Sequence, residues 1–176
     1  IEVSATVDRE EVHILAYGID PDTAALRRHL GSMQEARRDR AWAMIDRLRA
    51  EGMDIDGDLL RDKIETTHAV GRPHVAAVLV QAGHVDSIRD AFDRYLDDDG
   101  PAYVPKPTFA AADALRVIHE AGGVGVLAHP GHWTPQSRIR RLVDEGLDGI
   151  EVWHPSHDPS LHGYYGRLAR GYGLWK

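Results

Sequence analysis

The chain has 176 residues, of which 43% are apolar and 28% are charged, and its net charge is −7. It has no cysteine, which excludes disulfides, thiolate metal sites and cysteine nucleophiles, and a cytoplasmic location is expected. The negative charge argues against a broad surface for double-stranded DNA, and the apolar runs are shorter than the roughly 18 residues that a membrane span needs. Eleven histidines are the one compositional excess, and they direct attention to metal ligation.

The first predicted element is a β-hairpin. Residues 1–7 and 11–19 are β-prone runs on either side of the polar "DRE", as in two strands joined by a tight turn. With a loop of two residues, the register puts Glu2 and His13 on the same face of the hairpin.

A helical block follows the hairpin. Apolar residues at three- and four-residue steps predict a long helix, or a helix pair, that ends at Gly52. Two further helical patterns lie at about 74–82 and 86–96, before the polar "DDDGPAYVPKP" breaks the periodicity. We therefore expect residues 20–105 to form an all-helical insertion.

After this block, helices and strands alternate. The pattern predicts strands and helices at 110–121 (helix), 124–128 (strand), 135–145 (helix), 148–153 (strand) and about 160–171 (helix). Such alternation indicates a parallel sheet or barrel built from βα units. In these folds the ligand site lies at the carboxyl ends of the strands.

Two histidines directly follow predicted strands: His129 in "GGVGVLAHPGHW" and His154 in "GLDGIEVWHPSH". A metal ion that activates water and binds a phosphate needs imidazoles and carboxylates from several strand ends. Glu2, His13 and His157 are also placed to contribute. Taken singly, each of the five is weak evidence, because a lone histidine at a strand end is more often a hydrogen-bonded structural residue or an ordinary surface residue, and Glu2 could simply face solvent.

Basic residues of the helical block suggest an anion site. In "VGRPHVA", Arg72 offers a planar fork for a phosphate and His74 a further donor near a helix N-terminus. The alternative is a plain helix start with Pro73 near its first position. Arg37 and Arg40 are three residues apart and share a helix face, which by default is a solvated surface.

Nucleotide-dependent redox chemistry and kinase chemistry have no support in the sequence. The chain has no glycine-rich dinucleotide fingerprint and no phosphate-loop lysine pattern, and it lacks a G-x-S-x-G elbow.

Several motifs along the chain resemble those of one known family. "IEVS", "VHILAYGID", "GRPHVAAVLVQAG", "AGGVGVLAHPG" and "GLDGIEVWHPSH" closely resemble the PHP-domain (polymerase and histidinol phosphatase) metal-dependent phosphoesterases. Within that family the chain is most similar to the branch that includes RNase AM and the nucleoside 3′,5′-bisphosphate phosphatases. The resemblance implies an α/β fold: a distorted (β/α)7 barrel, present here in part as residues 1–19 and 106–176, with residues 20–105 as a helical substrate cap.

The resemblance also implies roles for individual residues. Glu2, His13 and His129 match metal ligands of the family, and His129 is thereby a catalytic residue. The remaining matches bind the substrate phosphate, and Arg72 among them also stabilises the charge that develops on the phosphoryl oxygens. These substrate-binding positions are Arg72, His74, Arg37, Arg40, His154 and His157.

Two family motifs are expected outside this sequence. H-x-H would precede Ile1 and G-S-D-x-H would follow Trp175, so we expect a fragment of a longer protein that lacks five or six of nine metal ligands.

The implied function is hydrolysis of phosphate esters of nucleotides or of short RNA 5′ ends by a metal-activated hydroxide. The implied cofactors are two or three divalent ions, namely Mn, Fe, Zn or Mg. Two alternatives stay open: a truncated, inactive remnant that serves at most as a binding module, and a phosphatase of the histidinol-phosphate type.

Overall fold

The computed structural model describes residues 1–67, 69–132 and 134–176. They form two compact units. Ile1–His29 and Thr108–Lys176 make up the first, here called the sheet unit, and Leu30–Pro107 make up the second, the helical unit. Within the described residues, no helix has both the length and the apolar character that a membrane crossing requires.

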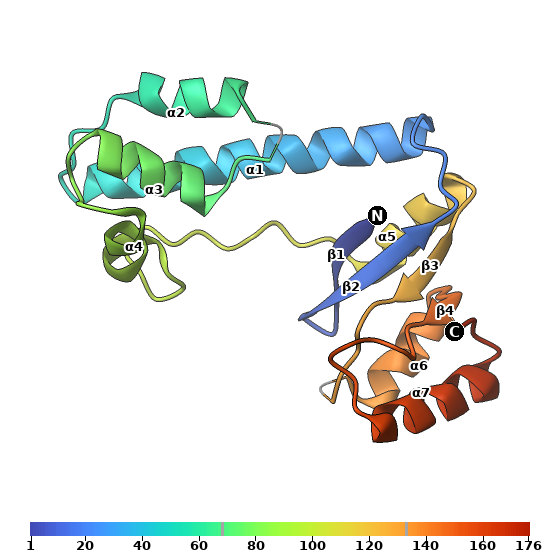
Figure 1. The fold of residues 1–176 in the computed structure, drawn as a ribbon. Coiled ribbons are helices and arrows are strands. Elements are labelled where there is room, and N and C mark those ends of the chain that lie inside the picture. Colours follow the sequence, from blue (N-terminus) through green and yellow to red (C-terminus); the bar gives the residue numbers. More distant parts are fainter. Residues whose placement is uncertain (68, 133) are drawn as a thin grey trace. The chain divides into compact units, whose positions relative to one another are not determined.

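The sheet unit contains a four-stranded mixed sheet with the order β1-β2-β3-β4 (Figure 1). Its strands are β1 (Glu2–Val7), β2 (Glu10–Tyr17), β3 (Val124–Leu127) and β4 (Gly149–Ile150). The first two pairings are antiparallel and the third is parallel. The predicted hairpin register is confirmed, because Glu2 pairs with Leu15 and Ser4 with His13.

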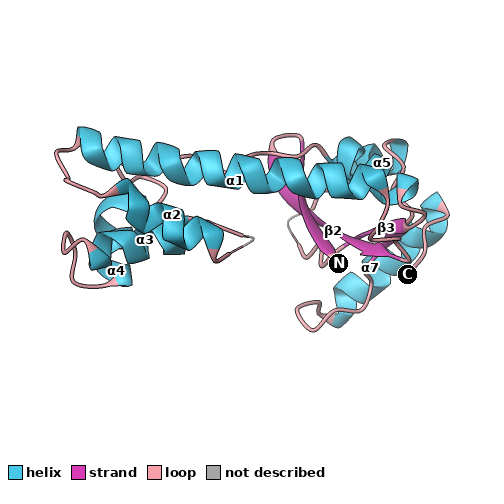
Figure 2. Ribbon diagram, turned by 90° about the horizontal axis from the view of Figure 1, so that it is seen from above, coloured by secondary structure: helices cyan, strands magenta, loops and turns pink. Residues whose placement is uncertain are grey.

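Three helices accompany the sheet, as the sequence predicts: α5 (Ala111–Glu120), α6 (Gln136–Asp144) and α7 (Pro159–Tyr172) (Figure 2). They share one core with alternate strand residues such as Ile14 and Leu127. Because side chains alternate along a strand, His13 and Leu15 belong to the opposite face of the sheet. Gly125 permits the close approach of α5, since a Cβ atom there would lie 2.4 Å from Cδ2 of Leu115.

The architecture is therefore mixed α/β, with one four-stranded sheet among the described residues. The predicted strand at 148–153 is shorter in the structure, since only Gly149 and Ile150 keep the ladder. Trp175, which follows the last predicted helix, adds a parallel bridge to Gly149.

The helical unit is built from the greater part of a single long helix and several short ones. These are α1 (Ala24–Ala50), whose first turns belong to the sheet unit, followed by α2 (Gly57–Glu65), α3 (Arg72–Gln81), α4 (Ile88–Ala91) and the π-helical turn η1 (Phe92–Leu96). No helix was predicted at α2, because its few apolar residues set no clear period. The start of α2 is marked by its N-cap residue, Asp56, whose carboxylate accepts a hydrogen bond from the Asp58 N–H at 3.0 Å.

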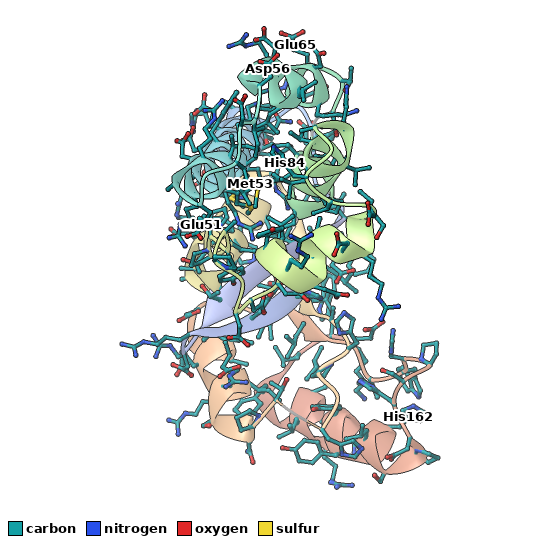
Figure 3. All side chains as sticks on the ribbon, turned by 90° about the vertical axis from the view of Figure 1, so that its left-hand side faces the viewer. Glu51, Met53, Asp56, Glu65, His84 and His162 are labelled. Atoms are coloured by element: carbon teal, nitrogen blue, oxygen red, sulfur yellow. The ribbon has the colours of Figure 1, made fainter. Side chains whose placement is uncertain are left out.

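The core of the helical unit is made by α1 and its neighbours, with Met44, Leu48, Leu60 and Leu79 fully buried. The connection from α1 to α2 is tied to the turn after α3, where Nε2 of His84 lies 2.8 Å from the Asp54 carbonyl oxygen. Figure 3 labels His84 in this unit.

Candidate metal centre

One carboxylate and two imidazoles converge in the sheet unit. Nδ1 of His13 lies 2.8 Å from Oε1 of Glu2 and 3.3 Å from Nε2 of His129. Nε2 of His129 lies 3.3 Å from the same Glu2 oxygen. All three ligand atoms fall within 4.8 Å of one another, which is the arrangement that a metal ion bound by these side chains requires.

Strand pairing explains the convergence. Glu2 and His13 share a face of the β1–β2 hairpin as diagonal neighbours, a spacing that long side chains bridge. The antiparallel pairing of β2 with β3 then brings the end of β3 beside His13, whose carbonyl accepts the Ala128 N–H at 2.9 Å. His129 follows at once, with a positive φ of 26°.

The second nitrogen of His13 faces a further carboxylate. Its Nε2 lies 3.4 Å from Oε1 of Glu11. If Nε2 carries the proton and donates it to Glu11, Nδ1 keeps its lone pair for the centre. Carboxylate–histidine–metal arrangements of this kind fix the tautomer of a ligating imidazole. The donor set therefore fits a divalent cation that accepts both nitrogen and oxygen ligands.

An open pocket of about 340 Å³ adjoins the cluster. Glu11, His13, His129, Pro130 and Thr134 are among its lining residues. Small molecules can therefore reach the imidazoles of His13 and His129 from solvent.

His154 is close to the cluster, with its ring centroid 5.4 Å from that of His129. Its Nδ1 accepts the Ser156 N–H at 3.1 Å and lies 2.7 Å from the Ser156 hydroxyl oxygen. A nitrogen that accepts an N–H carries no proton, so the proton of the neutral ring is on Nε2. His154 thus presents an N–H donor, which suits a phosphate oxygen better than a metal ion.

His157 was predicted to bind the substrate phosphate, but in the structure it bonds to the protein backbone. It is buried, and Nδ1 donates to the Val152 carbonyl at 3.1 Å while Nε2 accepts the Gly131 N–H at 3.2 Å. In this arrangement neither nitrogen is left for a phosphate.

Arg72 lies in the helical unit, at the start of α3. Its Nη1 donates to the Leu96 carbonyl at 3.1 Å and to Oδ1 of Asp98 at 2.8 Å. Its guanidinium carbon is 5.6 Å from the centroid of the Phe92 ring and 5.7 Å from that of the Tyr103 ring. The sequence placed Asp98 only in the polar segment that breaks the helical periodicity, and this ion pair was not predicted.

Arg40 belongs to the same group of cations. Its Nε donates to the Val104 carbonyl at 2.7 Å, but its Nη2 is buried and no described residue accepts a hydrogen bond from it. Burial lowers the pKa of Arg40, and the nearby positive charges of Arg72 and Arg37 lower it further. Three clustered guanidinium groups with one buried unpaired donor favour an anion.

His74, by contrast, caps its own helix. Its Nδ1 accepts the Gly71 N–H at 3.2 Å, and Gly71 occupies the N-cap position of α3. The remaining nitrogen, Nε2, then carries the proton as a donor.

Two carboxylates near the centre were missed by the sequence analysis. Glu11 contacts His13, and Oε2 of Glu151 accepts the His129 N–H at 2.6 Å. For Glu11 a signal was present, because residues two apart in a strand share a face. Glu151 offered no comparable signal, since it approaches His129 only through the β3–β4 pairing.

No family model matches the chain, but similar proteins are found. The chain is 32% identical over 181 residues to the 5′-3′ exoribonuclease Rnm of Escherichia coli, covering 99% of the chain and 61% of that protein. It is 36% identical to a 3′,5′-nucleoside bisphosphate phosphatase of Chromobacterium violaceum, covering 89% and 57%. It is 33% identical to a phosphoribosyl 1,2-cyclic phosphate 1,2-diphosphodiesterase of Eggerthella lenta, covering 99% and 68%.

Two solved structures are also similar. One is described as a metal-dependent phosphoesterase of Bifidobacterium adolescentis, with a TM-score of 0.72 and 28% identity. The other is an amidohydrolase of Chromobacterium violaceum with bound sulfate, with a TM-score of 0.67 and 35% identity. Each match covers 98% of the chain and 63% of the solved protein. The chain thus spans about three-fifths of the length of the first two relatives.

Proposed function

Because the chain belongs to the PHP-domain metal-dependent phosphoesterases, we propose that it serves the hydrolysis of phosphate esters on nucleotides or on the 5′ ends of short RNA. The observation that carries this proposal is the convergence of Glu2, His13 and His129. By their names, the relatives described above cleave RNA, a nucleoside bisphosphate and a ribosyl cyclic phosphate. Phosphoesters attached to ribose are their common substrate class.

In this proposal Glu2, His13 and His129 hold a divalent cation. One carboxylate with two imidazoles suits Mn²⁺, Fe²⁺ or Zn²⁺ better than Mg²⁺, which prefers oxygen ligands alone. A cation bound there would supply the Lewis acid that activates water and neutralises charge on the phosphoryl group. A second or third ion would need ligands beyond these three.

His154 is the proposed donor to the substrate beside this centre. Its Nε2–H is free of the contacts that occupy Nδ1. A donor held in place by Ser156 stabilises negative charge on a phosphoryl oxygen with little reorganisation.

The helical unit contributes guanidinium groups to substrate binding. Arg72 presents a planar fork close to two aromatic rings. In Arg40, the buried Nη2 has no acceptor among the described residues. Arg37 adds positive charge and His74 a donor at the N-terminus of α3. Guanidinium groups bind phosphate oxygens through two parallel hydrogen bonds, which favours an ester with an additional terminal phosphate.

The fold proposal follows from the same family membership. We take β1–β4 and α5–α7 to be part of a distorted (β/α)7 barrel and the helical unit to be its substrate-binding insertion.

The test is release of inorganic phosphate from adenosine 3′,5′-bisphosphate, with and without added Mn²⁺, by the protein that carries this chain. We expect Mn²⁺-dependent release that is lost in His129→Ala. His132→Ala is the matched control, because His132 contacts Asp158 at 3.1 Å and is outside the cluster. Full activity in His129→Ala would show that the assignment of the centre is wrong.

A further inference from the structure

The turn that carries His129 has an unusual backbone. His129 has a φ of +26° and Gly131 a φ of +55°, both in the left-handed region. For a histidine this conformation is strained, and it persists only where the surroundings impose it. The hydroxyl of Thr134 donates to the Pro130 carbonyl at 2.9 Å and braces the turn from within.

His157 holds this turn through the Gly131 N–H. The Val152 carbonyl can only accept, so Nδ1 of His157 carries the proton, and Nε2 is the bare nitrogen that accepts from Gly131. His157 is only 6% exposed, so water does not compete strongly for either contact.

Tyr165 holds the other backbone polar group of Gly131, its carbonyl. Its hydroxyl, on α7, donates to the Gly131 carbonyl, and its ring stacks on His157 with centroids 5.6 Å apart. Burial raises the pKa of Tyr165 to about 12, so the hydroxyl keeps its proton at physiological pH. Both polar atoms of Gly131 are thereby fixed by buried side chains.

Glu151 fixes the start of the turn. Its carboxylate accepts the His129 N–H at 2.6 Å, a short distance typical of charge-assisted hydrogen bonds. The backbone of Glu151 is itself anchored, because its N–H donates to the Leu127 carbonyl at 2.9 Å.

We propose that Glu151, His157 and Tyr165 are positioning residues that clamp the turn from His129 to Gly131 and so aim the His129 imidazole at Glu2 and His13. The inference deepens the proposed function and rests on it for the identity of the centre. None of the three needs to touch the substrate. Outer residues of this kind raise metal affinity by 10–100-fold in other proteins, because they remove the cost of orienting a ligand.

The first test measures the turn without any metal, by NMR on the 176-residue chain. In Tyr165→Phe we expect the Gly131 amide to exchange with solvent at least about tenfold faster, because one side of the clamp is lost. The nuclear Overhauser contacts between the His13 and His129 rings should weaken as well. Tyr164→Phe is the matched control, since its ring adjoins Tyr165 and no hydrogen bond of its hydroxyl to the turn is seen among the described residues.

Glu151 allows a rescue experiment. Glu151→Ala should broaden or shift the His129 amide resonance, whereas Glu151→Gln should restore most of it, because an amide oxygen still accepts the hydrogen bond. A merely structural residue would give no such pattern in the His129 signals. Unchanged His129 and Gly131 signals in Glu151→Ala and Tyr165→Phe would overturn the clamp.

The second test uses Co²⁺ as a spectroscopic probe of the centre. We expect Tyr165→Phe and Glu151→Ala to raise the Kd for Co²⁺ about 10-fold or more, with Tyr164→Phe at the wild-type value. Equal Kd values in all the variants would contradict the clamp. A wild-type chain that binds no Co²⁺ would instead contradict the metal centre, and the NMR comparison would then decide the clamp by itself.

Discussion

Oε1 of Glu2 lies 2.8 Å from Nδ1 of His13, so a carboxylate from β1 and an imidazole from β2 meet on the face of the sheet opposite the helices. Two ligand types at this separation suit a metal ion, and His129 supplies the third group at 3.3 Å from both. The relationship depends on the hairpin register, because a shift of one residue would turn one of the two side chains to the other face.

Glu11 should matter to the centre through His13. Glu11→Ala removes the acceptor 3.4 Å from Nε2 of His13, and we expect metal affinity to fall by about 10-fold. Titration calorimetry with Mn²⁺ measures this. The matched control is Glu10→Ala on the same strand, which should keep the wild-type affinity.

Arg72 should bind the substrate more than it drives the chemistry. Arg72→Ala should raise the KM for adenosine 3′,5′-bisphosphate by roughly 10-fold or more, the value of a charge-assisted hydrogen bond, with a smaller change in kcat. Arg89→Ala is the control, because its side chain is 91% exposed. A KM unchanged in Arg72→Ala would remove Arg72 from the substrate site.

A variant of Asp98 tests the role of Arg72 in phosphate binding without removing the Arg72 side chain. Arg72 is paired with Asp98 at 2.8 Å. Asp98→Asn removes the negative charge of this pair and leaves the positive charge of Arg72 available to a phosphate. We expect binding of inorganic phosphate to strengthen, as measured by calorimetry. Weaker binding in Asp98→Asn would mean that the ion pair orients Arg72 instead of competing with the phosphate.

His29 should make stability fall in mild acid. Burial lowers its pKa below the ordinary 6.5, with Asp113 opposing, so the unfolded chain binds this proton more readily than the folded one. The contribution to stability is therefore full above about pH 6.5 and is lost as the pH falls through the lower folded value. His29→Phe keeps a ring against Phe109, 3.9 Å between centroids. Urea unfolding between about pH 7.5 and 5 should show a smaller loss in the variant than in the wild type.

Gly125 should tolerate no side chain. An added Cβ would lie 2.4 Å from Leu115 Cδ2 and 3.3 Å from Ile14 Cγ2, so Gly125→Ala should lower the free energy of unfolding by about 1–3 kcal/mol. In Gly171→Ala on α7 nothing lies within 4 Å of the new Cβ, and stability should rise by about 0.5–1 kcal/mol. Equal stability of the two variants would contradict the packing of α5 on the sheet.

Local sequence patterns predicted much of the fold. The hairpin register, the helices of the sheet unit and the position of β3 follow from periodicity and turn residues. The periodicity left open whether the first helical segment was one helix or two, and the structure has one, α1. The predicted helix at 86–96 divides into the α-helix α4 and the π-helical turn η1. No residue pattern predicts this change from α-helical to π-helical winding.

The centre was predictable only in part. Strand ends and a family resemblance pointed to Glu2, His13 and His129, and the structure brings these three side chains together. The hydrogen-bond partners of His157 and Tyr165 could not be predicted. Both side chains bond to backbone atoms of Gly131, and the spacing of residues in the sequence does not reveal contacts to the backbone. The same holds for Glu151 and the His129 N–H.

The most direct measurement is the metal content of the purified 176-residue chain, by elemental mass spectrometry after dialysis against a weak chelator. We expect near-stoichiometric Mn, Fe or Zn in the wild type and none in the triple variant Glu2→Ala, His13→Ala, His129→Ala. A folded wild-type chain without metal, or a triple variant that retains it, would contradict the assignment of these three side chains as a metal centre.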